Sequence, residues 1–207
     1  MKLEAVNLLT LLDDNSVNYK LFEHEAFYTV EESSKLKIDM NMQGAHTKNL
    51  FLRDKKRNFF LISCLDNQIV DLKEIKNLIS CQGNLSFGSP DYLFEKLGVK
   101  PGSVSPYALV NNLDKDVTFY LDKGITVFDL CNFHPLDNTK TIQVLTKEFL
   151  RFLKTITNIK LIDFEYAVPE GSNLEIEEDF INHIRRHWDS SVFENRLKIL
   201  LINGTLM

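Results

Sequence analysis

The sequence predicts a mixed α/β fold in which short helices decorate a mixed, partly closed β-sheet. Several short segments alternate apolar and polar residues, and four or five others have helical spacing. The two kinds of segment do not alternate regularly, so a doubly wound parallel sheet is less favoured. With 207 residues, 44% hydrophobic and 26% charged, the chain fits one globular domain, alone or with an appendage.

For the first third of the chain the sequence predicts two helices and two strands, in the order helix, strand, helix, strand. Residues 3–12 place leucines at helical spacing, and residues 17–21 alternate as a strand does. Thr29 and Glu32 have the spacing of a capping box, so a short helix is expected from Val30. The polar segment 44–49 runs into apolar residues, which is typical of a loop that feeds a strand over 48–53.

The middle of the chain is punctuated by turn and cap residues. Residues 54–58 form a polar hairpin tip, and the apolar run 59–65 is the returning strand. Asp71 opens a helix that runs to about Ile79. Ser89 before a proline opens another helix, and Gly98 closes it.

The last third is predicted to be richer in strands, with one long helix. One strand is expected to end at 110–112. Further strands are expected over 117–121, 125–130, 141–145 and 161–166. Residues 147–157 form the expected helix. Beyond 170, residues 175–201 have a helical stripe, so we expect a domain over 1–169 and a helical extension over 170–207.

Composition excludes several classes of function. A net charge of −5 argues against sequence-blind coating of nucleic acid. A candidate local basic patch consists of Lys48, Arg53, Lys55, Lys56 and Arg57, with a solvated hairpin tip as the alternative interpretation. No apolar run is long enough to span a membrane, and no secretory signal is apparent. The three scattered cysteines match no metal or redox spacing and fit a reducing compartment, so a cytoplasmic location is expected.

Three stretches contain the residues best suited to chemistry. Lys48 and Asn49 stand at a strand start after Gly44, which suits an anionic or ester-bearing ligand, although a single lysine there is more often solvated. The loop 100–109, with two prolines and two serines, either lines a polar pocket or is a plain connection between its neighbouring elements. His134 precedes a proline, so its backbone is held extended.

These stretches resemble, in register, the YbaK/ProX family of aminoacyl-tRNA deacylases. The matching segments are Gly-Ala-His-Thr-Lys-Asn-Leu-Phe-Leu from Gly44, Gly-Ser-Val-Ser-Pro-Tyr-Ala-Leu from Gly102, His-Pro-Leu-Asp-Asn-Thr from His134, and Glu-His with Thr-Val-Glu-Glu-Ser from Glu23. The resemblance covers about residues 1–168. It is strongest to free-standing prolyl-tRNA editing proteins that act on alanyl-tRNA(Pro).

The resemblance implies a curved mixed sheet and hydrolysis of the ester between a wrong amino acid and the 3′ adenosine of tRNA. It implies Lys48, Asn49 and His134 as the catalytic set, and no metal or cofactor. The substrate-binding residues it implies are Thr47, Gly102, Ser103, Val104, Ser105, Pro106, His24 and Thr29. The expected partners are the acceptor end of tRNA(Pro), through Arg53, Lys55, Lys56 and Arg57, and prolyl-tRNA synthetase as a candidate.

Two alternatives stay open at this point. The amino acid removed is alanine in the first interpretation, with cysteine or another small amino acid as the rival. A protein of the same fold that only binds tRNA or a synthetase, without catalysis, is the rival from another class. Oligomeric state is equally open between a monomer and a weak dimer.

Overall fold

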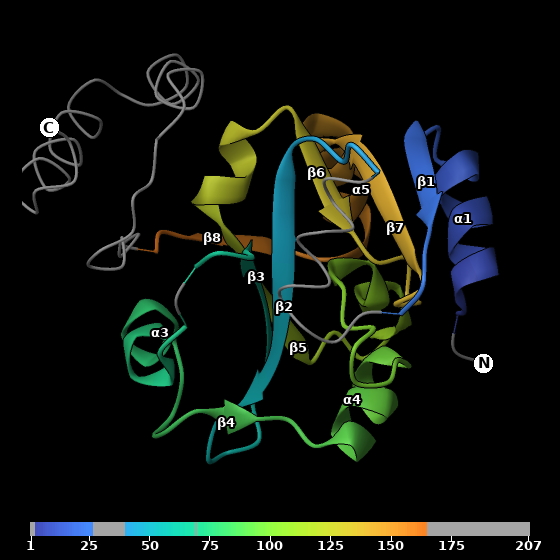
Figure 1. Cartoon of the computed structure of the whole chain (residues 1–207). Helices are drawn as coiled ribbons and strands as arrows, with labels where there is room; N and C mark the ends of the chain where they lie inside the picture. The colour runs from blue at the N-terminus through green and yellow to red at the C-terminus, as the bar shows by residue number, and fades with distance from the viewer. Residues whose placement is uncertain (1–2, 27–39, 69, 165–207) are drawn as a thin grey trace, which may run out of the picture. The chain divides into compact units, whose positions relative to one another are not determined.

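The computed structural model describes residues 3–26, 40–68 and 70–164, and a single mixed sheet dominates them (Figure 1). Its order is β1-β7-β6-β2-β3-β5-β8, and β4 pairs with β2 off this path. The sheet is mixed, as predicted, and stays open. The strands are β1 (Tyr19–Glu23), β2 (Ala45–Arg53), β3 (Phe59–Leu65), β4 (Ser86–Phe87), β5 (Val117–Asp122), β6 (Leu130–Phe133), β7 (Lys140–Leu145) and β8 (Ile159–Ile162).

Short helices surround the sheet, and local capping explains where two of them begin. The Asp71 side chain accepts from the Lys73 N–H at the start of α3, and the Ser89 hydroxyl accepts from the Tyr92 N–H at the start of α4. Gly98 ends α4 with φ 69°, as predicted. The helices are α1 (Ala5–Asp14), α3 (Leu72–Leu78), α4 (Pro90–Leu97), η1 (Pro106–Asn111), η2 (Lys123–Val127) and α5 (Thr146–Ile156).

The two faces of the sheet are covered by different elements. On one face, the even-numbered side chains of β2 and β3 pack with Ile75 of α3 and Ile79 just after it. On the other face, Tyr107 of η1 packs edge-on against Phe133 and Phe149, with ring centroids 6.2 and 5.8 Å away. Successive residues of β2 therefore contribute to two separate layers.

Strand β2 is paired differently along its two edges. One edge pairs with β3 from Thr47 to Arg53. The other pairs with β6 only at Ala45 and His46, and with β4 only at Leu52 and Arg53. In the described part of the chain, residues 47–51 thus have no strand beside them on that edge, although the Phe51 carbonyl accepts from the Gly88 N–H at 2.9 Å.

The odd-numbered residues of β2 direct their backbone groups to this bare edge. The Ala45 carbonyl accepts from Asn132 Nδ2 on the β6 side, whereas the His46 carbonyl accepts from the Asp66 N–H on the β3 side. Because backbone direction alternates along a strand, the N–H and C=O of Asn49 face the opening between β6 and β4. The predicted site residues Thr47, Lys48 and Asn49 belong to this stretch, and its unpaired edge is called the bare edge of β2 below.

Several predicted element boundaries are wrong. Strand β2 begins at Ala45, so the polar segment expected to be a loop is mostly strand, because pairing with β3 and β6 overrides its composition. The expected strand 125–130 is instead η2 followed by β6, since the Asp122 carboxylate accepts from the Gly124 N–H and starts a turn. Residues 110–112 belong to η1 and the turn after it.

Some predictions concern residues outside the described part. These are the helix expected from Val30 and the extension 170–207. The last strand, expected over 161–166, is instead β8 at Ile159–Ile162, and residues 163–164 after it are not strand. Among the described helices, none is long and apolar enough to cross a membrane.

Candidate active site

Lys48 lies in the middle of the site on β2, opposite Cys64 of β3. Its half-buried side chain donates from Nζ to the backbone carbonyl of Gln68. An ammonium has three N–H donors, so this contact orients Lys48 and leaves donors for a ligand. Burial raises the pKa of the neighbouring Cys64 thiol to about 12 despite the opposing charge of Lys48, so Cys64 is a neutral thiol and not a nucleophile.

Asn49 and Thr47 lie on the sheet face opposite Lys48, because side chains alternate along β2. The Asn49 Oδ1 accepts from the Ser63 hydroxyl at 2.6 Å, so its amide NH₂ is the part oriented for a ligand. The Thr47 hydroxyl donates to the Asn132 carbonyl at 2.8 Å and ties β2 to β6 where the two strands separate. The side chains of Lys48 and Asn49 therefore cannot approach a ligand from the same face.

His134 and His24 lie together beyond the ends of β6 and β1. Their ring centroids are 6.2 Å apart, and His24 Nε2 lies 2.9 Å from the Thr141 hydroxyl. His134 Nδ1 lies 2.7 Å from the Lys140 carbonyl, so Nδ1 carries the proton and Nε2 is an acceptor in the neutral ring. Burial lowers the pKa of His134 below its ordinary value, which keeps the ring neutral near pH 7.

The predicted pocket loop, Gly102 to Pro106, connects α4 to η1. Gly102 has φ 90°, and the Ser103 N–H donates to the Lys100 carbonyl within a tight turn. Ser105 is buried, and its hydroxyl accepts from the Tyr107 N–H at the start of η1. Two of the groups expected to hold a ligand in this loop, the Ser103 N–H and the Ser105 hydroxyl, thus build the loop itself, and Val104 is half-buried beside them.

The four basic residues predicted to contact tRNA lie on the β2–β3 hairpin. Arg53 is half-buried at the end of β2, and Lys55, Lys56 and Arg57 are exposed at the tip. The predicted substrate residue Thr29 lies outside the described residues. The structure therefore brings Thr47, Lys48 and Asn49 onto the bare edge of β2, and pairs His24 with His134 close to the adjoining β6.

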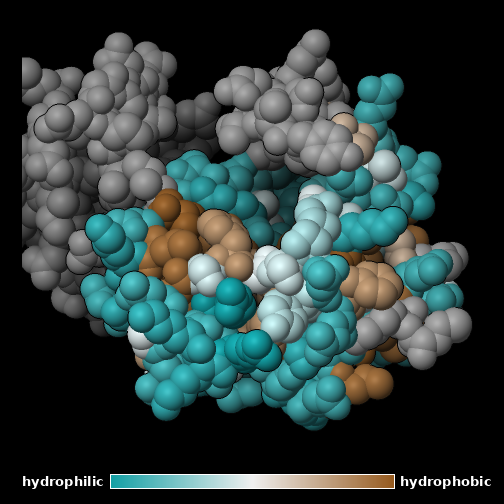
Figure 2. Space-filling view, turned by 90° about the horizontal axis from the view of Figure 1, so that it is seen from below, coloured by the Kyte–Doolittle hydropathy of each residue, from teal (hydrophilic) through white to brown (hydrophobic). Residues whose placement is uncertain are grey.

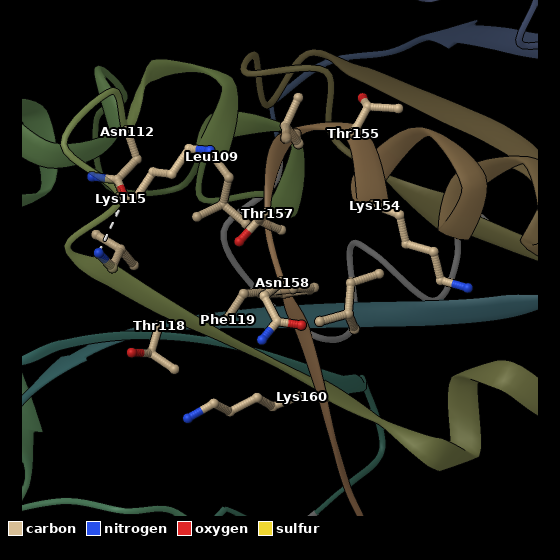
Figure 3. Close-up of a pocket in the computed structure, with 13 residues that line it drawn as sticks. Leu109, Asn112, Lys115, Thr118, Phe119, Lys154, Thr155, Thr157, Asn158 and Lys160 are labelled. Atoms are coloured by element: carbon tan, nitrogen blue, oxygen red, sulfur yellow. Dashed lines mark hydrogen bonds between the residues drawn. The ribbon is translucent and has the colours of Figure 1, made fainter.

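A separate cavity of about 630 Å³ lies away from these residues, between β5, β8, η1 and the end of α5 (Figure 3). Lys115, Lys154 and Lys160 line it, and none of the residues predicted for the site does. Among the described residues, no group of three or more histidine, cysteine, aspartate or glutamate side chains is placed to hold a metal ion. The predicted site residues that the structure brings near one another are those on the β2 edge, with Lys48 among them, and the histidine pair.

Comparison with known protein families identifies the family of this chain. A family model described as the aminoacyl-tRNA editing domain matches residues 24–152, which include all of these groups. The chain belongs to this family. As an aminoacyl-tRNA editing domain protein, it covers 83% to 91% of the length of the three curated relatives described next.

One such relative is the prolyl-tRNA editing protein ProX of Acetoanaerobium sticklandii, 34% identical over 152 residues, which are 73% of this chain and 91% of that protein. Another is the prolyl-tRNA synthetase associated domain-containing protein 1 of Xenopus laevis, 36% identical over 151 residues, with 71% and 88% covered. The mouse protein of the same name is 34% identical over 143 residues, with 67% and 83% covered.

Solved structures confirm the fold of this editing domain protein. A proposed trans-editing enzyme for prolyl tRNA synthetase superposes with a TM-score of 0.58 at 17% identity, covering 80% of this chain and 99% of that one. A protein studied for epitope backbone grafting onto scaffolds superposes with a TM-score of 0.62 at 16% identity, covering 81% and 100%. Both likenesses concern the fold.

Residues that the sequence analysis did not single out complete the site. Gln68 holds Lys48, Ser63 orients Asn49, and Asn132 Nδ2 donates to the carbonyls of Gln43 and Ala45. Ser63 had a detectable signal, because it interrupts an otherwise apolar strand of seven residues. Gln68 had none, since its contribution to the site is a backbone carbonyl.

Proposed function

We propose that the protein is a trans-acting deacylase that hydrolyses Ala-tRNA(Pro). The observation that carries the proposal is the match to a prolyl-tRNA editing protein over 91% of that relative's length, in a chain that presents Lys48 at the bare edge of β2. The relatives named for association with prolyl-tRNA synthetase make that synthetase the candidate protein partner.

Hydrolysis of an aminoacyl ester needs a placed water and a stabilised oxyanion, but no covalent nucleophile. The water oxygen bonds to the ester carbon, the bond to the ribose oxygen breaks, and a proton passes from the water to that ribose oxygen. The adjacent ribose hydroxyl of the substrate is suited to relay this proton, because it lies next to the leaving oxygen. The products are free alanine and tRNA with an intact 3′ end.

Each site residue has a role that fits its contacts. Lys48, held by Gln68, supplies positive charge to the oxyanion or the terminal phosphate. The Asn49 backbone N–H faces the bare edge and is a second donor for the carbonyl oxygen. The acceptor Nε2 of neutral His134 suits the ammonium group of the bound amino acid.

Size is the basis for choosing alanine. A synthetase site built for proline rejects smaller alanine poorly, because a missing methylene changes binding by only about 1–3 kcal/mol. A second site that is too small for proline completes the discrimination, and we assign this steric limit to the loop around Pro106, which is buried at the start of η1.

The direct test uses tRNA(Pro) charged separately with Ala, Pro, Cys and Ser. We expect fast loss of the alanyl ester and little loss of the prolyl ester. Loss of cysteine or serine instead would keep the chemistry and change the substrate. No loss of any ester above the protein-free control would contradict the deacylase assignment.

The rate is also expected to depend on pH through His134. Its pKa is lowered, so the ring is neutral and accepting at pH 7, and protonation removes the acceptor only below the ordinary imidazole value of about 6.5. Single-turnover rates, corrected for spontaneous hydrolysis, should be level above that value and fall below it. His134→Gln, which keeps an acceptor that does not titrate, should flatten the acid limb; an unchanged limb would assign it to another group.

A further inference from the structure

An exposed aromatic side chain stands next to the basic hairpin at one end of the fold. Phe87 of β4 is 60% exposed although it belongs to the sheet. β4 pairs directly with the end of β2, where Arg53 lies opposite Ser86. Figure 2 looks onto this lower end and shows apolar patches set in a mainly hydrophilic surface. Surfaces that bind single-stranded nucleic acid combine exposed aromatic side chains, on which bases stack, with basic side chains that bind phosphates. Phe87 and the basic hairpin provide both kinds of side chain.

The hairpin tip is held in place by one buried carboxylate. Asp54 is 1% exposed and accepts from the N–H groups of Lys56, Asn58 and Gln82 at 2.8, 3.0 and 2.8 Å. Burial alone would raise the pKa of Asp54, but the hydrogen bond from Asn58 Nδ2, at 2.7 Å, together with the three N–H groups outweighs it and holds that pKa below its ordinary value. The backbone that carries Lys55, Lys56 and Arg57 is therefore ordered before any ligand binds, which lowers the entropic cost of binding.

Phe87 lies on the same face of the sheet as Lys48. Phe87 is the register partner of Leu52, and register partners share a face, as do residues 48, 50 and 52 of β2. Leu52 follows Lys48 by four residues, which is about 13 Å along the strand. Between the two positions, the β2 edge has no strand beside it among the residues that the structure describes. This separation is too long for one nucleotide and suits a short unpaired strand that ends at Lys48.

We propose that Phe87 stacks on an unpaired base of the tRNA 3′ end, while Arg53, Lys55, Lys56 and Arg57 bind the flanking phosphates. The identity of the RNA rests on the proposed function, but the stacking contact does not depend on catalysis. The terminal adenosine lies at Lys48, and the preceding nucleotides follow the bare edge of β2 to Phe87. The basic hairpin then contacts the RNA where its unpaired 3′ end joins the duplex.

The test measures binding of an uncharged, fluorescently labelled single-stranded RNA that ends in CCA. Phe87→Ala should weaken binding by roughly 5- to 150-fold, the range for loss of one stacked base, and Phe87→Trp should retain it. Phe94→Ala is the matched control, because Phe94 is 56% exposed on α4 and its loss should leave affinity unchanged. Lys56→Ala should reduce the salt dependence of binding, whereas Phe87→Ala should not.

Equal affinity of Phe87→Ala and Phe94→Ala for this RNA would overturn the proposal. Phe87 is largely solvated, so its truncation should leave thermal stability nearly unchanged, and a melting curve of each variant checks this. Because the RNA is uncharged, the result is independent of ester hydrolysis. Phe87-dependent binding by a protein that hydrolyses no aminoacyl-tRNA would support the platform while contradicting the deacylase.

Discussion

Lys48→Ala is expected to lower the single-turnover rate of Ala-tRNA(Pro) hydrolysis by roughly 100- to 1,000-fold, the usual loss when one oxyanion donor is removed. The reason is that Lys48 is the charged side chain on the bare segment of β2, and its contact with the Gln68 carbonyl fixes its direction before substrate binds. The measurement is the rate at saturating protein, so that weaker substrate binding does not enter it.

Two matched variants sharpen this result. Lys48→Arg keeps the charge but changes the donor geometry, so partial activity is expected. Lys123→Ala removes a lysine that is 55% exposed and forms a surface ion pair with Asp163, so the rate should not change. A Lys48→Ala protein that keeps its single-turnover rate but loses affinity for uncharged tRNA would assign Lys48 to phosphate binding and leave the oxyanion to backbone donors. An unchanged rate with unchanged affinity would remove Lys48 from the site.

The sequence was sufficient where local chemistry decides structure. Ser89 and Gly98 mark the two ends of α4 through capping and a left-handed φ, and both were predicted. The apolar run of β3 and the polar hairpin before it were also predicted, because a seven-residue buried strand leaves a plain pattern. The family could be recognised because its motifs are short, contiguous and well spaced.

The rest depends on contacts between distant residues. The polar start of β2 becomes strand only through pairing with β3 and with Cys131 and Asn132 of β6. The predicted strand over 48–53 already places the side chains of Lys48 and Asn49 on opposite faces, whereas the bare edge between β6 and β4 follows only from the pairing. A motif read along the sequence sets these two residues side by side, whereas the strand separates their side chains.

Gly44→Ala is expected to cost about 3 kcal/mol of folding free energy, because it combines a left-handed backbone with a close approach. Gly44 has φ 87°, and a Cβ there would lie 2.3 Å from the backbone oxygen of Leu130, where β6 begins. That oxygen belongs to the backbone and cannot rotate away. The strain falls on the junction of β2 and β6, so hydrolysis should fall together with a melting temperature roughly 6–12 °C lower.

Gly83→Ala is the control that separates the two causes. Gly83 has nearly the same φ, 83°, but its added Cβ would meet the flexible Lys55 side chain at 3.0 Å. It should therefore lose only the smaller cost of a left-handed alanine, about 1–2 kcal/mol, and keep its hydrolysis of the ester. Equal destabilisation by the two variants in thermal melting would show that backbone conformation alone requires glycine at position 44. A larger loss at Gly44, with activity lost in parallel, would show that the close contact of β2 with β6 positions Lys48 for catalysis.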